Sequence, residues 1–317
     1  MKLREIYERA VQLGIEADPR GPEEIQRLLE QVKKEYTDLK EEDKPFFDRE
    51  RLFNPYSDTR ILHGADDLEV QRILAGIDME IGEVMLADRL REKGVGIDLI
   101  ISHHPEGKAL AALHDVMHLQ EDMMHQLGVP INVAEGIMAS RISEVHRGFL
   151  PVNHNRAVNA AQILDLPFMC VHTPADNLVT RFLNQLFAAK SPRTVGDVVK
   201  ILKEVPEYRE ARKSKAGPEI IVGSEKKRAG QIYVDMTGGT SGPDTAYEKL
   251  ARAGVGTIVA MHMPEKHRTE AEKHHINVVI AGHMASDSLG LNLFLDDLEQ
   301  QGLEVIPCSG LIRVCRN

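Results

Sequence analysis

From about residue 70 onward, apolar runs of strand length alternate with stretches of helical periodicity. The first series predicts a strand at 73–77, a helix at 82–93 and a strand at 98–102. Later runs predict a strand at 168–172, helices at 177–189 and 195–204, a last strand at 276–281 and a helix at 288–300. Strands that alternate with helices in this way indicate an α/β fold with right-handed crossovers.

Part of this pattern recurs 160 positions later. A helix that ends in Gly-Val-Gly at 88–96 matches 248–256, and an apolar strand follows each copy. The first strand ends in Ser-His103-His104-Pro105, and the second in His262-Met263-Pro264. We therefore expect two similar α/β lobes from an internal duplication, at 61–190 and 191–317, although strand–turn–helix units also recur by coincidence.

The first 60 residues have a different pattern. Two polar helices are predicted at 3–13 and 22–39, separated by a breaker that contains Pro19 and Gly21. The second has Ile25, Leu28 and Val32 at helical spacing. We expect residues 1–60 to form a helical extension appended to the lobes.

Composition excludes several classes of function. The net charge is −10 and the only compact basic run is 226–228, so nucleic acid is a poor candidate partner. No apolar run approaches the roughly 20 residues of a membrane helix, and the acidic start lacks the apolar core of a signal peptide, which favours a cytoplasmic protein. The three cysteines lack Cys-x-x-Cys spacing, so neither a disulfide framework nor a structural zinc site is indicated.

Two adjacent histidines, His103 and His104, follow the predicted strand 98–102, where α/β proteins usually place ligand sites. Pro105 ends the strand and disfavours a helix at His104. Neighbouring side chains on a strand point to opposite faces, so the pair more naturally serves two metals, or one metal and a substrate, than one ion. The alternative is a structural pair in a loop.

Acidic residues follow two other predicted strands. His283 and Asp287 are four positions apart after the strand 276–281, so they share a face if a helix begins there. Asp176 follows the strand 168–171, where it could equally cap the next helix. Taken together, the three histidines and two aspartates favour a metal site.

Other candidates carry weaker signals. The loop Gly238-Gly-Thr-Ser-Gly242 leads to a helix expected near Pro243 and could bind an anion or form a tight turn. His114 and His118 share a face of a helix expected at 109–127, most simply a polar surface. His146 and His154 could line a substrate pocket.

With these motifs, the chain resembles the Nif-three-like family, whose members are often labelled GTP cyclohydrolase 1 type 2 homologues. The matching segments occur in the family's order and cover about 65–317: Leu99-Ile-Ile-Ser-His-His-Pro105, His172-Thr-Pro-Ala-Asp176, Gly238–Gly242 and Gly282-His-Met-Ala-Ser-Asp287. The resemblance implies a two-lobed α/β fold with two divalent metal ions between the lobes. The ligands it implies are His103, His104, Asp176, His283 and Asp287. It also implies a homo-oligomer, in many members a hexameric ring.

The chain departs from the family's pattern at three places. The final acid is usually Glu, so Asp287 is one methylene shorter and its reach to the metal is expected to be reduced or shared through water. Glu106 and Gly107 replace the usual apolar residues after His-His-Pro. The N-terminal Asp-Asn-x-Gly-Leu segment has only a vague counterpart around 58–64. These departures suggest a divergent subfamily with its own substrate.

Histidine and carboxylate donors without thiolates suit zinc, iron, manganese or nickel. The primary hypothesis is a metal-dependent hydrolase of a phosphorylated or nucleotide-like small molecule, with Asp176 or hydroxide bridging the two ions and Glu106 as general base. The alternative is a non-catalytic metal-binding scaffold or metal-handling ring.

Overall fold

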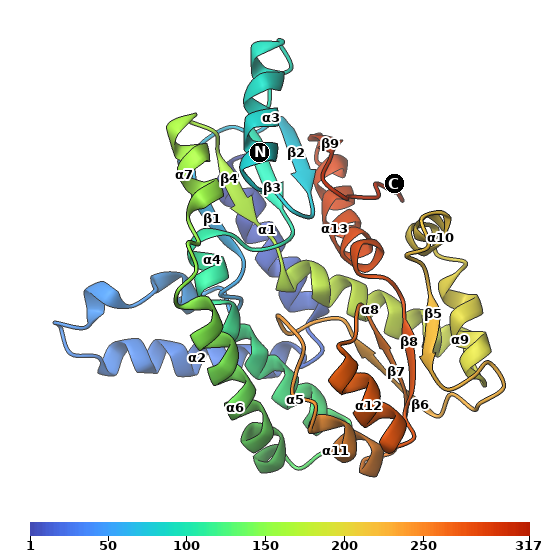
Figure 1. Ribbon diagram of the computed structural model, residues 1–317. Helices are drawn as coiled ribbons and strands as arrows, with labels where there is room; N and C mark the ends of the chain where they lie inside the picture. Colours follow the sequence, from blue (N-terminus) through green and yellow to red (C-terminus); the bar gives the residue numbers. More distant parts are fainter.

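The computed structural model of the protein describes residues 1–317 and contains two β-sheets surrounded by helices (Figure 1). The first sheet has the strand order β1-β4-β3-β2-β9. Its strands are β1 (Arg60–His63), β2 (Arg72–Gly76), β3 (Leu99–Ser102), β4 (Phe168–Cys170) and β9 (Glu304–Pro307). The second sheet has the order β5-β8-β7-β6. Its strands are β5 (Glu219–Val222), β6 (Gln231–Asp235), β7 (Val255–Ala260) and β8 (Asn277–Ile280).

The two sheets share one topology. In each, the first strand along the chain pairs antiparallel with the fourth, and the fourth, third and second lie parallel in that order. Strands β2, β3, β4, β7 and β8 are largely buried, as their continuous apolar runs predict for parallel strands covered on both faces. The two-lobed α/β fold is confirmed, and the repeated strand order is what a duplication would produce.

Helices connect and cover the strands. The longer helices are α1 (Leu3–Ala17), α2 (Pro22–Asp38), α3 (Ile81–Glu92), α6 (Ile131–Phe149), α8 (Thr173–Lys190) and α13 (His283–Gln300). The shorter ones are α4 (Gly107–Ala111), α5 (Leu119–Gln126), α7 (Arg156–Ile163), α9 (Val195–Leu202), α10 (Pro206–Lys213), α11 (Ala246–Arg252) and α12 (Glu265–Lys273). The single helix expected at 109–127 is instead α4, the 3-10 helix η3 (Leu113–His118) and α5, and two further 3-10 turns, η1 (Lys44–Phe46) and η2 (Arg49–Leu52), follow α2. No helix is long and apolar enough to cross a membrane.

The expected N-terminal extension is only partly separate. Helix α2 buries one side chain, Ile25, and lies along the outside of the molecule with the 3-10 turns that follow it (Figure 1). Helix α1 belongs to the core, because Leu3, Ile6 and Tyr7 are fully buried in the cluster that covers the first sheet. A Cβ on Gly14 would lie 2.7 Å from Cβ of Pro174, so α1 packs directly on the first turn of α8.

The boundary expected at residue 190 does not follow the packing. Strand β9, near the C-terminus, pairs with β2 of the first sheet. Helices α5 and α6, from the first half of the chain, pack with the second sheet through residues such as Met123, Met138 and Tyr233. The two lobes therefore exchange segments, because the apolar faces of these elements find their partners across the predicted boundary.

Helices α8 and α13 pack against each other between the sheets (Figure 1). They approach closely at Gly290, where a Cβ would overlap the carbonyl oxygen of Ala175. Glycine is required there because any side chain would force the helices apart. Asp176 lies in the first turn of α8 and Asp287 at the start of the second turn of α13, so this crossing brings them together.

Candidate metal centre

His103 follows strand β3 and is almost completely buried. Its Nδ1 donates a hydrogen bond to the carbonyl oxygen of Val171 over 3.1 Å, so Nε2 carries the lone pair. Nε2 lies 3.5 Å from Oδ1 of Asp176 and 3.6 Å from Oδ1 of Asp287. Fixing one ring nitrogen by a hydrogen bond and presenting the other to a metal is the usual arrangement of a ligating histidine.

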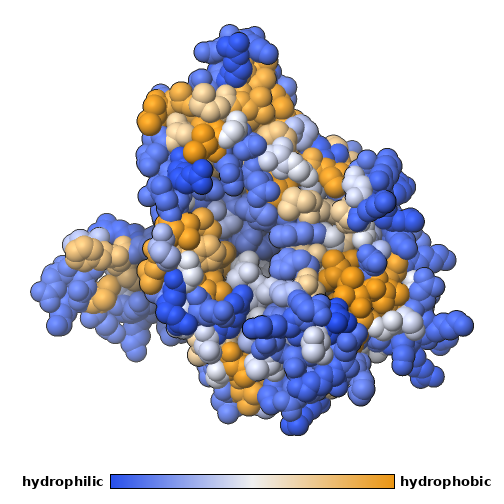
Figure 2. Space-filling model, in the orientation of Figure 1, coloured by the Kyte–Doolittle hydropathy of each residue, from blue (hydrophilic) through white to orange (hydrophobic).

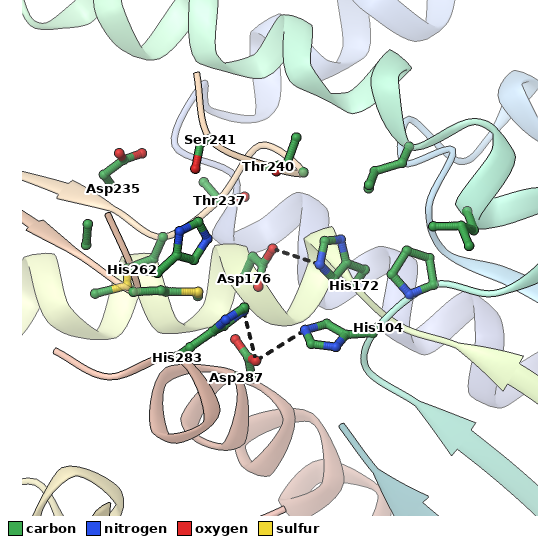
Figure 3. Close-up of a pocket in the computed structure, with 17 residues that line it drawn as sticks. His104, His172, Asp176, Asp235, Thr237, Thr240, Ser241, His262, His283 and Asp287 are labelled. Atoms are coloured by element: carbon green, nitrogen blue, oxygen red, sulfur yellow. Dashed lines mark ion pairs between the residues drawn. The ribbon is translucent and has the colours of Figure 1, made fainter. Parts of the chain in front are cut away.

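His104 is half-buried and also points to the carboxylate of Asp287. Its Nδ1 lies 2.6 Å from Oδ1 of Asp78, which orients the ring, and its Nε2 lies 3.4 Å from Oδ2 of Asp287. His283 Nε2 lies 3.4 Å from the same oxygen (Figure 3). The structure thus brings together the five predicted ligands, and Asp287 reaches all three histidines despite its shorter side chain.

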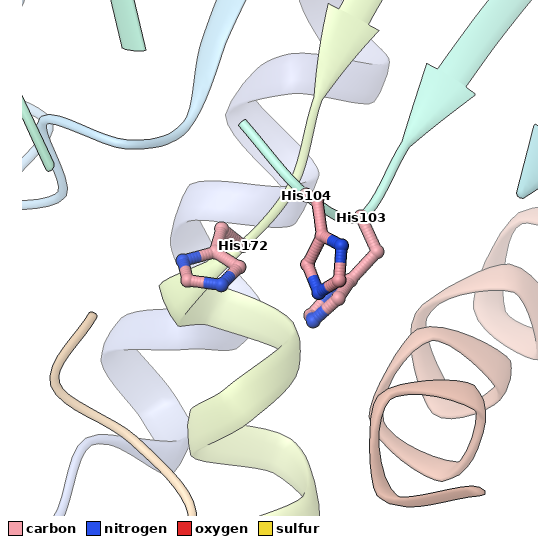
Figure 4. Close-up of side chains that lie close together, drawn as sticks. All are labelled: His103, His104 and His172. Atoms are coloured by element: carbon pink, nitrogen blue, oxygen red, sulfur yellow. The ribbon is translucent and has the colours of Figure 1, made fainter. Parts of the chain in front are cut away.

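His172 is a sixth member of the cluster that the sequence did not assign. Its ring lies 4.9 Å from that of His103, measured between centroids (Figure 4). Nδ1 lies 2.8 Å from Oδ2 of Asp58, and Nε2 lies 3.8 Å from Oδ2 of Asp176. The spacing of His172 and Asp176 equals that of His283 and Asp287, and each pair begins a helix after a parallel strand, which was the available signal.

The unpaired atoms of the cluster fit a metal. Oδ1 of Asp176 and both carboxylate oxygens of Asp287 are buried without a hydrogen-bond partner. Buried carboxylates normally pair or coordinate ions, since an unpaired buried charge is costly. Three sets of donor atoms lie close enough to share an ion: His103 with Asp176 and Asp287; His104 with His283 and Asp287; and the three histidines His103, His104 and His172. The first two sets share Asp287. Asp176, which the sequence analysis gives with hydroxide as an alternative bridge, belongs to only one of them.

Burial and the neighbouring charges shift the pKa values of the clustered groups in different directions. Burial lowers the pKa of His103 to about 4, which keeps its ring neutral at pH 7. Burial raises the pKa of Asp176 well above its usual range. Although burial acts in the same sense on Asp287, the rings of His103, His104 and His283 hold its pKa below the usual range. Burial favours neutral His172, but Asp176 and Asp58 raise its pKa to about 9. Asp176 and His172 would therefore have to lose their protons before they could coordinate an ion.

A cavity of about 270 Å³ opens beside the cluster, between the lobes. The first lobe contributes His104, His172 and Asp176. The second contributes the ends of β6 and β7 and the intervening loop, with Asp235, Thr237, Thr240, Ser241 and His262 among them (Figure 3). Figure 2 shows the same face hollowed near the centre of the view.

The glycine-rich loop forms one wall of this cavity and is a structural turn. Gly238 and Gly239 have positive φ angles of 101° and 83°, and a Cβ at Gly239 would lie 2.8 Å from Val116. Gln120 donates to the carbonyl oxygens of Gly238 and Thr240 over 2.6 and 2.7 Å. The expected helix begins only at residue 246 and has seven residues, so the loop presents no helix N-terminus to an anion.

Glu106, the expected general base, does not line the cavity. Pro105 directs the chain away, and Glu106 precedes α4, with Glu80, Asp78 and Arg156 nearby. This placement gives no support to its catalytic role. The histidines of uncertain role lie outside the cavity too: His114, His118 and His146 share a separate surface groove, and His154 accepts a hydrogen bond from Gly107 through its carbonyl oxygen.

Replacing Glu106 with glutamine is expected to stabilise the protein at high pH. Burial, followed by the charges of Glu80 and Asp78, raises the pKa of Glu106 to about 7. A carboxyl with a raised pKa in the folded state loses stability as pH rises from its unfolded value of about 4.5 through 7, since the unfolded chain ionises first. Thermal unfolding should therefore show a larger gain for Glu106→Gln at pH 8 than at pH 5. An equal gain at both values would contradict this account.

One of the comparisons with known proteins, that with solved structures, finds a similar fold. No protein-family model and no curated protein matches the chain. Among solved structures, the chain is similar to a NIF3 superfamily protein from Sphaerobacter thermophilus, with 25% identity, a TM-score of 0.70, and coverage of 80% of this chain and 92% of that one. It is less similar to reduced HcgD from Methanocaldococcus jannaschii (15% identity, TM-score 0.49, coverage 78% and 87%) and to TTHA1606 from Thermus thermophilus (14%, 0.45, 82% and 89%).

The class of this protein follows from its two β-sheets of one topology and from the histidine–aspartate cluster where helices α8 and α13 cross between them. It is a two-lobed α/β protein with a candidate metal centre at the junction of the lobes. Its fold is similar to that of the NIF3 superfamily, as the resemblance of its motifs predicts.

Proposed function

We propose that this chain is a metal-dependent hydrolase that holds two divalent ions at the lobe junction and acts on a small molecule in the adjacent cavity. One observation carries the proposal. Both oxygens of Asp287 are buried without hydrogen bonds, and each lies 3.4–3.6 Å from imidazole nitrogens that can coordinate a metal. An ion beside each oxygen would neutralise a carboxylate that otherwise has no partner for its lone pairs.

The ligands divide naturally into two groups. His103, Asp176 and one oxygen of Asp287 would hold the first ion, and His104, His283 and the other oxygen would hold the second. His172 provides a further nitrogen beside Asp176. Nitrogen and oxygen donors without sulfur suit zinc, iron, manganese or nickel.

The cavity favours catalysis over storage. Few protein ligands for two ions leave coordination positions free, which is typical of catalytic rather than structural sites. When bound, such ions supply Lewis acidity, which lowers the pKa of water and stabilises developing negative charge during hydrolysis. A scaffold that only holds metal would not require an open cavity of about 270 Å³ beside the ligands.

The chain's own residues can orient a substrate in this cavity. The ring of His262 lies 5.0 Å from that of His283, between centroids, on the wall opposite the first lobe. Asp235 accepts a hydrogen bond from the hydroxyl of Tyr233 over 3.1 Å, which holds its carboxylate in place at the cavity wall. With Thr240 and Ser241, these groups offer hydrogen bonds to a small polar molecule, for example a phosphoester or a ring that contains a C=N bond. Met236 and Met261 form the apolar part of the wall.

Metal-dependent turnover tests the proposal. Protein purified without chelator and loaded with each candidate ion should hydrolyse at least one member of a panel of phosphoesters, nucleotides and cyclic amidines. His104→Ala should lower the rate by about 100-fold or more, since a bound ion supplies several kcal/mol of charge stabilisation. His275→Asn is the matched control, because His275 is exposed and has a φ of 61°, which asparagine tolerates.

The outcomes separate the two candidate functions. A metal-loaded sample that hydrolyses nothing in the panel would contradict the hydrolase and leave the non-catalytic scaffold. Elemental analysis that finds no metal in protein purified without chelator would contradict both.

A further inference from the structure

The cavity beside the metal cluster contains neither lysine nor arginine. Its ionisable lining consists of histidines and the carboxylates of Asp176, Asp235 and Asp287. Beyond the histidines, this cavity offers no cationic side chain to an anion. A phosphate of the substrate that does not lie at the metal cluster would therefore find no lysine or arginine in this cavity.

A second cavity of about 620 Å³ lies on the other side of the glycine-rich loop. Thr240 and Ser241 line both cavities, so the two are neighbours along one wall. The outer cavity, here called the outer groove, is bounded by α6, the residues that follow the loop, and the first turn of α12. It contains Arg141 and Lys266, the cations that the inner cavity lacks.

Arg141 is held in position at the loop. Its Nε donates to the carbonyl oxygen of Ser241 over 3.0 Å, and its Nη1 donates to Glu144 over 2.8 Å. The remaining Nη2 group has no hydrogen-bond partner in the protein. Glu144 is compensated by Arg141, which lowers the pKa of its carboxyl. The guanidinium therefore keeps N–H donors for a ligand in a fixed geometry.

Lys266 lies in the first turn of α12 and forms no ion pair, although it lines the same groove. The preceding Pro264 offers no side-chain cap, so the first amides of this nine-residue helix lack protein acceptors. Lys266 and the start of α12 thus border the same groove as Arg141. Asp244 is the one lining carboxylate without a cationic partner.

We propose that the outer groove binds a phosphate group of the substrate, between Arg141, Lys266 and the hydroxyls of Thr240 and Ser241, while the reacting bond lies at the metal cluster. This inference rests on the proposed function for the position of the reacting bond. It narrows the substrate to a molecule whose phosphate and reacting bond lie on opposite sides of the loop 238–242. Binding of the phosphate itself can be measured without turnover.

Calorimetric titration of the metal-loaded protein with inorganic pyrophosphate tests the proposal. Lys266→Ala should weaken binding by about tenfold, the usual cost of one charge-assisted hydrogen bond. Asp244→Asn should strengthen it, because the opposing carboxylate is removed. Lys273→Ala is the matched control: Lys273 lies in the last turn of the same helix, pairs with Glu270 and does not line the groove.

Pyrophosphate that also binds the ions contributes equally in all four proteins, so the differences report the groove. The proposal is supported if Lys266→Ala weakens binding, Asp244→Asn strengthens it and Lys273→Ala leaves it unchanged. It is overturned if the unmodified protein does not bind pyrophosphate, if Lys266→Ala binds equally well, or if Lys273→Ala loses as much. None of these results depends on whether a hydrolysed substrate is found.

Discussion

Asp287→Asn is expected to abolish binding of both of the proposed metal ions. The two carboxylate oxygens of Asp287 belong to different donor groups, one with His103 and Asp176 and one with His104 and His283. An amide has one oxygen, no charge, and an NH₂ group that would face imidazole nitrogens. Each ion would lose an anionic ligand, which should cost more than the roughly 10–100-fold in affinity that an outer-shell partner contributes.

The measurement is metal content per chain, by elemental analysis after gel filtration. Asp297→Asn is the control on the same helix, because it removes a carboxylate that pairs with Arg9 far from the cluster. It should retain the metal content of the unmodified protein. Full metal content in Asp287→Asn would contradict the shared-ligand assignment.

Asp78→Asn is expected to weaken the binding of one of the two proposed ions, the one at His104. Asp78 lies 2.6 Å from Nδ1 of His104 and so fixes the ring that presents Nε2 to Asp287. His103, in the other group, is oriented by the main-chain carbonyl of Val171, which the substitution leaves in place. We expect the ion at His104 to lose about 10–100-fold in affinity while the ion at His103 is retained.

A competitive titration that resolves two binding events measures this difference. Glu80→Gln is the matched control, because Glu80 is an exposed carboxylate two residues away that does not contact His104. Equal weakening of both ions by Asp78→Asn, or weakening of neither, would show that Asp78 does not position His104.

The parts of the fold that could be predicted are those with long buried runs. Strands β2, β3 and β8 and helices α3, α9 and α13 appear close to their expected places because their patterns follow from burial in one sheet or against it. Strand β9 escaped prediction because it has four residues, none fully buried, and gains its hydrogen bonds only from β2, more than 200 positions earlier. Helix α1 was expected as an arm because its partners, α8 and α13, lie more than 150 positions later in the sequence.

The residues of the site that could be predicted are likewise those with a local signal in the sequence. Its five predicted ligands follow apolar strands, where the chain leaves a parallel sheet at its carboxyl edge. His172 occupies such a position too, but its role depends on Asp58, which orients it from 114 positions away. Glu106 was expected at the site because it is two residues from His104. The chain turns at Pro105, however, and Glu106 does not line the cavity.

Crystal diffraction from metal-loaded protein, recorded at the absorption edge of the bound element, tests the central claim most directly. We predict two anomalous peaks at the lobe junction, one contacted by His103, Asp176 and Asp287 and the other by His104, His283 and Asp287. A single peak, or peaks whose ligands exclude Asp287, would contradict the assignment of a dinuclear centre built around this carboxylate.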